Sequence, residues 1–165
     1  MPRPDYAFRP LAAADLALLQ RWLAAPYVAR WGTPERQLAL RAADRNEPTI
    51  DQFGVTLSAE PFAYLPCYRA AAAEGPAGSE PAAPCGIDQL TAVPDMVGRG
   101  HGSALIRSFV DGLFAGGCPR VLTDPDPANE RAIRADRKAG FASERLLETS
   151  EGPRLLLTRD SDRNT

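Results

Sequence analysis

The sequence has little of what metal-binding, membrane-spanning and secreted proteins need. Histidine occurs once and cysteine three times in 165 residues, and their spacing suits neither a zinc site nor a redox pair. No apolar stretch approaches the 18 residues of a membrane helix, and the N-terminus lacks the apolar core of a signal peptide. We therefore expect a soluble, cytoplasmic protein with reduced thiols and no metal.

An excess of positive charge is also missing. Lys and Arg number 19 against 21 Asp and Glu, which gives a net charge of −2. A nucleic-acid-binding protein would be basic, whereas this balance is compatible with a cationic small molecule. The length suits one core. We expect one domain over residues 1–159, a polar tail over residues 160–165, and a monomer or homodimer that binds neither nucleic acid nor a membrane.

Hydrophobic periodicity and turn residues predict a mixture of strands and helices. The apolar residues of two predicted helices fall on one face each, namely Leu16, Leu19 and Leu23 in one helix and Leu105, Ile106, Phe109, Val110 and Leu113 in the other. The predicted strands cover residues 6–9, 53–58, 62–69, 86–91, 120–123, 141–147 and 154–158, and the predicted helices cover residues 13–25, 34–44, 102–114 and 129–139. Pro26 is expected to end the first helix, Thr33 to cap the second, and Pro66 to mark an edge or a bulge. Residues 70–84 are Ala, Gly and Pro with two Glu and one Ser, which suits either a passive surface linker or a substrate flap.

The most informative segment is Val97-Gly98-Arg99-Gly100-His101-Gly102, which leads directly into a predicted helix. Backbone N–H groups at a helix start have no partner within the helix, and glycine lets a ligand approach them closely. By itself this pattern is compatible with a phosphate or pyrophosphate site and with a glycine-rich turn that only starts a helix. A P-loop is excluded because the segment has no lysine, and a dinucleotide fold is disfavoured because no βαβ order precedes it.

These residues and two later segments resemble the GNAT acetyltransferases. Residues 97–102 are similar to that superfamily's Arg/Gln-x-x-Gly-x-Gly/Ala loop, although Val97 takes the Arg/Gln place, and residues 129–141 match its next segment. A closer resemblance, to the aminoglycoside 6'-N-acetyltransferases, covers most of the chain and is most specific at residues 86–90 and 123–141. It is poor between residues 35 and 84.

The resemblance implies an α/β (α+β) domain with a mixed, mostly antiparallel central sheet, flanked by helices, in which two parallel central strands splay apart. It implies acetyl-CoA as co-substrate. The residues expected to contact it are Leu90 and Thr91 on a strand, Val97, Gly98, Arg99, Gly100, His101, Gly102 and Ser103 in the loop, and Asn129. The loop binds pyrophosphate through its backbone amides. For Asn129 the pattern also predicts a helix N-cap, and for His101 an exposed helix start.

Transfer to an amine requires a group that orients the ammonium and accepts its proton. The resemblance assigns this role to Asp88, which we expect in mid-strand, on the same face as Leu90. Asp124 is expected either to bind a second amine of a polycationic substrate or to serve as a turn residue. Trp31 and Tyr68 are candidates for the wall of an acceptor cleft or for the core.

Two positions depart from the resembled family. Its tyrosine that protonates the departing thiolate corresponds here to Asp136, which can donate a proton only if desolvation keeps it protonated. The resembled enzymes hold acidic and aromatic substrate contacts in the region of residues 70–84, where this chain keeps only Glu74 and Glu80. The hypothesis is therefore an aminoglycoside 6'-N-acetyltransferase. The alternatives are an acetyltransferase for another amine, such as a metabolite, a siderophore precursor or a protein N-terminus, and a non-catalytic CoA-binding module.

Overall fold

A computed structural model describes residues 4–69 and 83–162. Most of the predicted loop at residues 70–84, and half of the predicted tail, lie outside these ranges. Contacts divide the chain into two compact units, the first made of Met1–Pro66 and Gln89–Gly102 and the second of Cys67–Asp88 and Ser103–Thr165. The backbone passes from one unit to the other after Pro66, after Asp88 and after Gly102.

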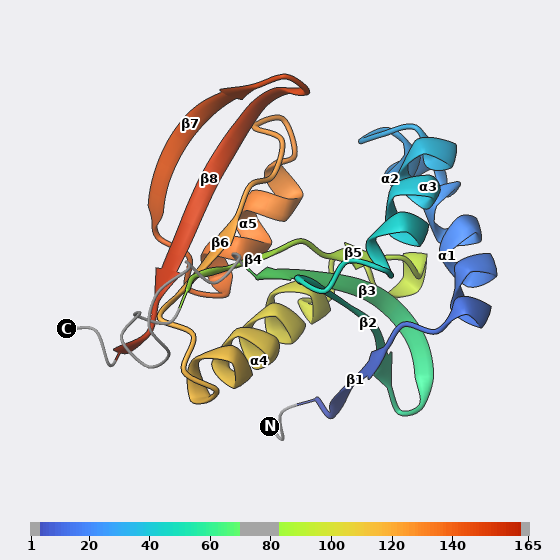
Figure 1. The fold of residues 1–165 in the computed structure, drawn as a ribbon, viewed down its shortest axis with the longest axis horizontal. Helices are drawn as coiled ribbons and strands as arrows, with labels where there is room; N and C mark the ends of the chain where they lie inside the picture. Colours follow the sequence, from blue (N-terminus) through green and yellow to red (C-terminus); the bar gives the residue numbers. More distant parts are fainter. Residues whose placement is uncertain (1–3, 70–82, 163–165) are drawn as a thin grey trace. The chain divides into compact units, whose positions relative to one another are not determined.

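Eight strands are hydrogen-bonded in the order β1-β2-β3-β4-β6-β8-β7, and β5 pairs with β3 (Figure 1). They are β1 (Tyr6–Pro10), β2 (Ile50–Leu57), β3 (Glu60–Arg69), β4 (Cys85–Ile87), β5 (Leu90–Thr91), β6 (Arg120–Thr123), β7 (Ser143–Thr149) and β8 (Gly152–Asp160). β4 and β6 run parallel, whereas β1 with β2, β3 with β4 and β5, and β8 with β6 and β7 are antiparallel. The predicted fold class is confirmed.

In the first unit, the predicted helix at residues 13–25 is a 3-10 turn, Ala13–Asp15, followed by α1 (Leu16–Leu23). Leu19 and Leu23 are buried against Tyr64, and Leu16 packs beside them, as the spacing predicted. Pro26 follows the end of this helix by three residues. It opens a short helix, α2 (Pro26–Ala29), because its fixed φ suits a first helical position.

The next helix, α3 (Pro34–Asp44), has the predicted bounds, but Thr33 caps it without a side-chain hydrogen bond. The turn between β2 and β3 was predicted too late in the chain. It lies at Ser58 and Ala59, whose φ values of 51° and 69° are in the left-handed region. Glu60 and Pro61 already belong to β3.

The strand predicted at residues 86–91 is split in two. Cys67–Arg69 of β3 pairs with β4, and Ala63–Tyr64 of β3 pairs with β5. Pro66 lies between these two paired segments of β3 and has no N–H to donate. It marks no sheet edge, because β3 lies between β2 and β4. The interruption is instead in the strand that pairs with β3, which is divided into β4 and β5. The prediction that Asp88 lies in mid-strand is therefore wrong, because Asp88 immediately follows β4.

In the second unit, α4 (His101–Ala115) and α5 (Glu130–Lys138) accompany β4, β6, β7 and β8. His101 and Gly102 at the start of α4 belong to the first unit. The predicted apolar face of α4 is confirmed, since Leu105, Ile106 and Val110 are fully buried. Arg159 of β8 forms an ion pair with Asp111 of α4 at 2.7 Å, and Arg107 of α4 donates a hydrogen bond to the carbonyl of Lys138.

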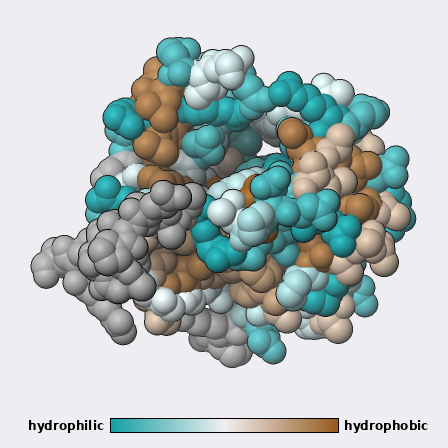
Figure 2. Space-filling view, in the orientation of Figure 1, coloured by the Kyte–Doolittle hydropathy of each residue, from teal (hydrophilic) through white to brown (hydrophobic). Residues whose placement is uncertain are grey.

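In the final hairpin, β7 begins and ends two residues later than predicted, β8 extends two residues further at each end, and the turn falls at residues 150–151. Asp160 belongs to β8 and pairs with Arg120 of β6, so it is not part of a polar tail. Figure 2 shows a surface on which hydrophilic residues prevail, with a hydrophobic strip over β7 and β8. Leu146 of β7 is 59% exposed. Within the described ranges, no helix has the length and apolarity needed to cross a membrane.

Candidate active site

The glycine-rich loop has the backbone that phosphate binding requires. Gly98 and Gly100 have φ values of 78° and 86°, a region that other residues rarely adopt. A Cβ added at either position would meet no heavy atom within 4 Å, so these glycines leave open space beside the chain. The 15-residue helix α4 begins at His101. Its first N–H groups can therefore bind an anion.

The side chain of His101 is held by the sheet of the first unit. Its Nδ1 lies 2.9 Å from the hydroxyl of Tyr6 on β1, with which it shares a hydrogen bond. Its ring also meets those of Phe62 and Tyr6 edge-on, with centroids 5.8 and 6.1 Å away. His101 was predicted to be an exposed helix start, but it is half-buried and fixes the helix start to β1 and β3. Arg99 is exposed.

Two carboxylates follow the parallel strands of the second unit. Cys85 pairs with Val121 and Gly86 with Leu122, and the parallel pairing ends there. Asp88 and Asp124 each lie two residues beyond the last pair. Partial desolvation is the main cause of a raised pKa at Asp124, and the negative charge of Asp88 adds to it. The positive charge of Arg154 opposes this shift in pKa. Asp124 as a whole residue is exposed. The register therefore brings together two of the predicted site residues.

Asp136 of α5 is a third carboxylate in this environment. It is 4% exposed, and the Thr123 hydroxyl lies 3.4 Å from its Oδ2 as a hydrogen-bond donor. Burial, followed by the charge of Asp88, raises the pKa of Asp136 to about 7, while the Thr123 hydrogen bond lowers it. The residue in the family's tyrosine position thus retains a proton well above the usual pH range of a carboxylic acid.

Asn129 caps α5 as predicted. Its side chain accepts a hydrogen bond from the backbone N–H of Ala132 at 3.2 Å. Three residues earlier, the Asp126 carboxylate accepts from the N–H of Ala128 at 2.8 Å, which is the chemistry of a turn residue. The segment from Asp124 to Asn129 is therefore an ordered connection between β6 and α5.

The remaining predicted contacts are distributed over both units. In the first unit, Leu90 packs against the core around Leu19, the hydroxyl of Thr91 donates to Gln89 at 3.2 Å, and Trp31 lies under the guanidinium of Arg30 at 5.2 Å. In the second unit, Tyr68 is half-buried on β3 and Ser103 is half-buried on α4. Their roles toward ligands remain predictions.

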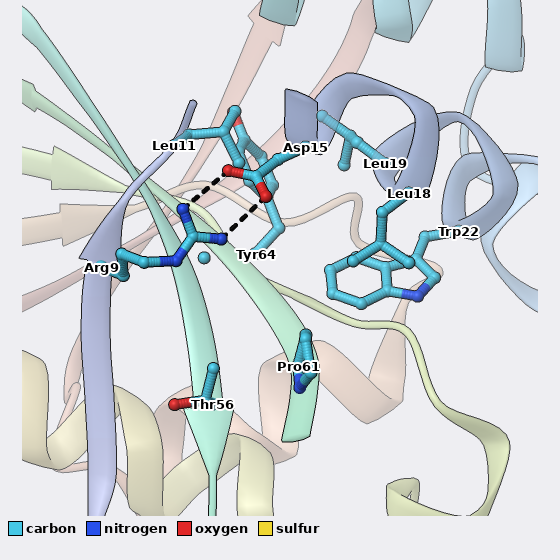
Figure 3. Close-up of a pocket in the computed structure, with 10 residues that line it drawn as sticks. Arg9, Leu11, Asp15, Leu18, Leu19, Trp22, Thr56, Pro61 and Tyr64 are labelled. Atoms are coloured by element: carbon cyan, nitrogen blue, oxygen red, sulfur yellow. Dashed lines mark hydrogen bonds and ion pairs between the residues drawn. The ribbon is translucent and has the colours of Figure 1, made fainter. Parts of the chain in front are cut away.

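A small pocket in the first unit lies elsewhere (Figure 3). Arg9 and Asp15 form a two-pronged ion pair at its edge, with N–O distances of 2.9 and 2.7 Å. The hydrogen bond from Arg9 lowers the pKa of Asp15. Leu18, Trp22 and Pro61 are among the other lining residues. Its volume of about 10 Å³ is about the room for one water molecule, which is too small for a substrate.

Cys67, Cys85 and Cys118 are not in disulfides, and the first two are buried. Burial raises the pKa of Cys85 to about 12, and the neighbouring thiols of Cys118 and Cys67 contribute to the shift. In the part of the chain that the structure describes, no three His, Cys, Asp or Glu side chains are grouped so that they could hold a metal ion.

The sequence reasoning missed two positioning residues, Tyr6 and Thr123. Tyr6 contacts a partner 95 positions away, and a single strand residue gives no local signal of such a contact. The parallel register does suggest the role of Thr123, because it precedes Asp124 at the end of β6.

Comparison with known families identifies the chain. The family model described as "Acetyltransferase (GNAT) domain" matches residues 12–149, and the predicted superfamily is thereby confirmed. The chain belongs to the GNAT acetyltransferases, which are acetyl-CoA-dependent enzymes.

Within this family, the chain is similar to enzymes that modify aminoglycosides. It is 33% identical over 156 residues to an aminoglycoside N(6')-acetyltransferase type 1 from Klebsiella pneumoniae, covering 88% of this chain and 78% of the relative. Among solved structures, that of AAC(6')-Ib with paromomycin and acetyl-CoA is 29% identical with a TM-score of 0.77, over 94% of this chain and 93% of the other. AAC(6')-Ib with coenzyme A and kanamycin gives 30% identity and a TM-score of 0.77, over 94% and 95%.

Proposed function

We propose that this protein transfers the acetyl group of acetyl-CoA to the 6'-amine of an aminoglycoside. The observation that carries the proposal is the pair of carboxylates, Asp88 and Asp124, beyond the last paired residues of parallel strands β4 and β6. A polycationic amine is the partner that such a pair of negative charges favours. The relatives named for aminoglycosides support the choice of acceptor.

In the proposed reaction, Asp88 orients the 6'-ammonium and accepts one of its protons. The freed amine attacks the thioester carbon, the C–S bond breaks, and the sulfur of coenzyme A leaves and takes up a proton. Asp124 holds a second ammonium group of the acceptor. Trp31 and Tyr68 are assigned to the acceptor side.

The backbone amides of residues 98–103 bind the pyrophosphate of acetyl-CoA, because glycine and the helix start leave their N–H groups accessible. Leu90, Thr91 and Asn129 contact the pantetheine arm, and Val97 contributes only backbone. The free thiols suit a reducing compartment, and we place the enzyme in the cytoplasm as a monomer or homodimer. The acyltransferase domain, predicted over residues 1–159, includes Asp160 as well in this proposal, because Asp160 is the last residue of β8.

Thiol release from acetyl-CoA tests the proposal. The purified protein is assayed with aminoglycosides that carry a 6'-amine and with one that carries a 6'-hydroxyl instead. Release with the amines alone is the expected result. Thiol release only with amines other than aminoglycosides would show that the acceptor belongs to another class of amine. Binding of acetyl-CoA without thiol release in the presence of any amine would favour a non-catalytic CoA-binding module.

A further inference from the structure

Asp136 has no role in the reaction described above, yet its position is unusual. Among the described residues it is the one acidic side chain in the buried class, at 4% exposure. A buried carboxylate without a cationic partner is costly, and Asp136 forms no ion pair within residues 4–69 and 83–162. Such a group needs either a proton or a compensating charge.

The fold connects Asp136 to the proposed acceptor-binding carboxylate. Asp136 accepts a hydrogen bond from Thr123, the last residue of β6. β6 runs parallel to β4, and Asp88 immediately follows β4. The carboxylates are close enough for the charge of Asp88 to act on Asp136.

Opposing influences hold the proton of Asp136 near balance. Burial is the strongest and, with the charge of Asp88, raises the pKa of Asp136 to about 7. The Thr123 hydroxyl favours the ionised form by donating to it. The same Asp88 charge also acts on Asp124, where Arg154 of β8 opposes it. A cation placed at Asp88 would therefore shift the balance toward ionised Asp136.

We propose that Asp136 is a positioning residue that holds a proton before the acceptor binds and releases it when a cationic amine binds at Asp88. This inference rests on the proposed function, which makes Asp88 the acceptor site. On release, the O–H bond of the Asp136 carboxyl breaks, the proton leaves to water, and Thr123 remains hydrogen-bonded to the carboxylate. The new negative charge then strengthens the hold on the ammonium group through Asp88.

Proton release on binding is the direct test. Kanamycin is titrated calorimetrically into the coenzyme A-bound protein at pH 7 in buffers of different ionisation heat. We expect the wild type to release up to about half a proton more per bound kanamycin than Asp136→Asn, because a group with a pKa of about 7 is half protonated there. Asp136→Glu should retain the release. Glu148→Gln, which removes an exposed carboxylate on β7, is the matched control and should behave as the wild type.

Equal proton release by the wild type and a folded Asp136→Asn variant would overturn the inference, even if the aminoglycoside is acetylated. A second measurement needs no acceptor. The carbon-13 titration of the Asp136 carboxyl should shift to a midpoint about one pH unit lower in Asp88→Asn. An unchanged midpoint would also overturn the inference. A lowered midpoint in a protein that acetylates no aminoglycoside would refute the proposed function and leave the coupling between Asp88 and Asp136 standing.

Discussion

The hydroxyl of Tyr6 and Nδ1 of His101 lie 2.9 Å apart and share a hydrogen bond between the first strand and the start of α4. His101 is the chain's only histidine, and its imidazole meets the ring of Phe62 as well. The side chain therefore secures the helix start to the sheet. The adjoining loop has left-handed glycines at 98 and 100, and its conformation depends on where that helix begins.

Tyr6→Phe is expected to weaken acetyl-CoA binding. The variant keeps the ring and loses one hydrogen bond, worth about 1 kcal/mol, so the KM for acetyl-CoA should rise about fivefold with little change in kcat. Steady-state kinetics with acetyl-CoA varied at saturating acceptor measures this effect. A changed KM for the acceptor with an unchanged KM for acetyl-CoA would refute the role given to Tyr6.

Asp88→Asn should reduce turnover by a factor on the order of 10²–10⁴, because the amide cannot accept the ammonium proton. The measurement is kcat with a 6'-amino aminoglycoside. Asp126→Asn serves as the control, since Asp126 accepts a hydrogen bond within a turn, and it should retain most of the activity. Near-full activity of Asp88→Asn would remove Asp88 from the role of base.

The raised pKa of Asp136 also predicts how stability depends on pH. The pKa of Asp136 is about 7 in the folded protein and ordinarily 3.8. Between these pH values, the folded protein therefore binds more protons than the unfolded chain does. The contribution of Asp136 is therefore fully favourable below about pH 4 and is lost as the pH rises toward 7. The loss amounts to as much as about 4 kcal/mol.

Urea unfolding of the wild type and of Asp136→Asn from pH 4 to pH 8 measures this dependence. The difference in unfolding free energy should move in favour of the variant as the pH rises, because the amide has no charge to bury. A difference that stays constant over this range would show that Asp136 is ionised throughout.

Substitutions at Asn129 separate its capping role from its proposed contact with coenzyme A. Asn129→Ala removes the acceptor for the N–H of Ala132 and should cost about 1 kcal/mol of stability. Asn129→Asp keeps that acceptor but loses the amide donor, so it should retain stability and raise the KM for acetyl-CoA. Thermal unfolding and kinetics on both variants distinguish the two roles. An unchanged KM for acetyl-CoA in Asn129→Asp would contradict the contact with coenzyme A and leave capping as the role of Asn129.

Local patterns predicted much of the fold. The spacing of Leu16, Leu19 and Leu23 identified the buried face of α1, and the Asn129 cap marked the start of α5. Errors arose where pairing partners decide the structure. The interruption after Asp88 reflects which residues of β3 pair with β4 and β5, and the turn at Ser58 and Ala59 uses left-handed residues that are not glycine.

The proposed site was predicted unevenly for the same reason. Glycine spacing indicated the loop, because left-handed backbone and open space are properties of glycine itself. The resemblance singled out Asp88 and Asp136, but whether a buried carboxyl keeps its proton depends on the neighbours that folding brings to it. Thr123 and Asp88 supply that environment, and neither adjoins Asp136 in sequence.

Locating the acetyl group in the product tests the central claim most directly. Kanamycin and acetyl-CoA are incubated with the protein, and the product is assigned by mass spectrometry and two-dimensional NMR. The account predicts a monoacetylated product with a new amide at the 6' nitrogen. A product acetylated at another nitrogen, or unmodified kanamycin beside a protein that acetylates other amines, would contradict it.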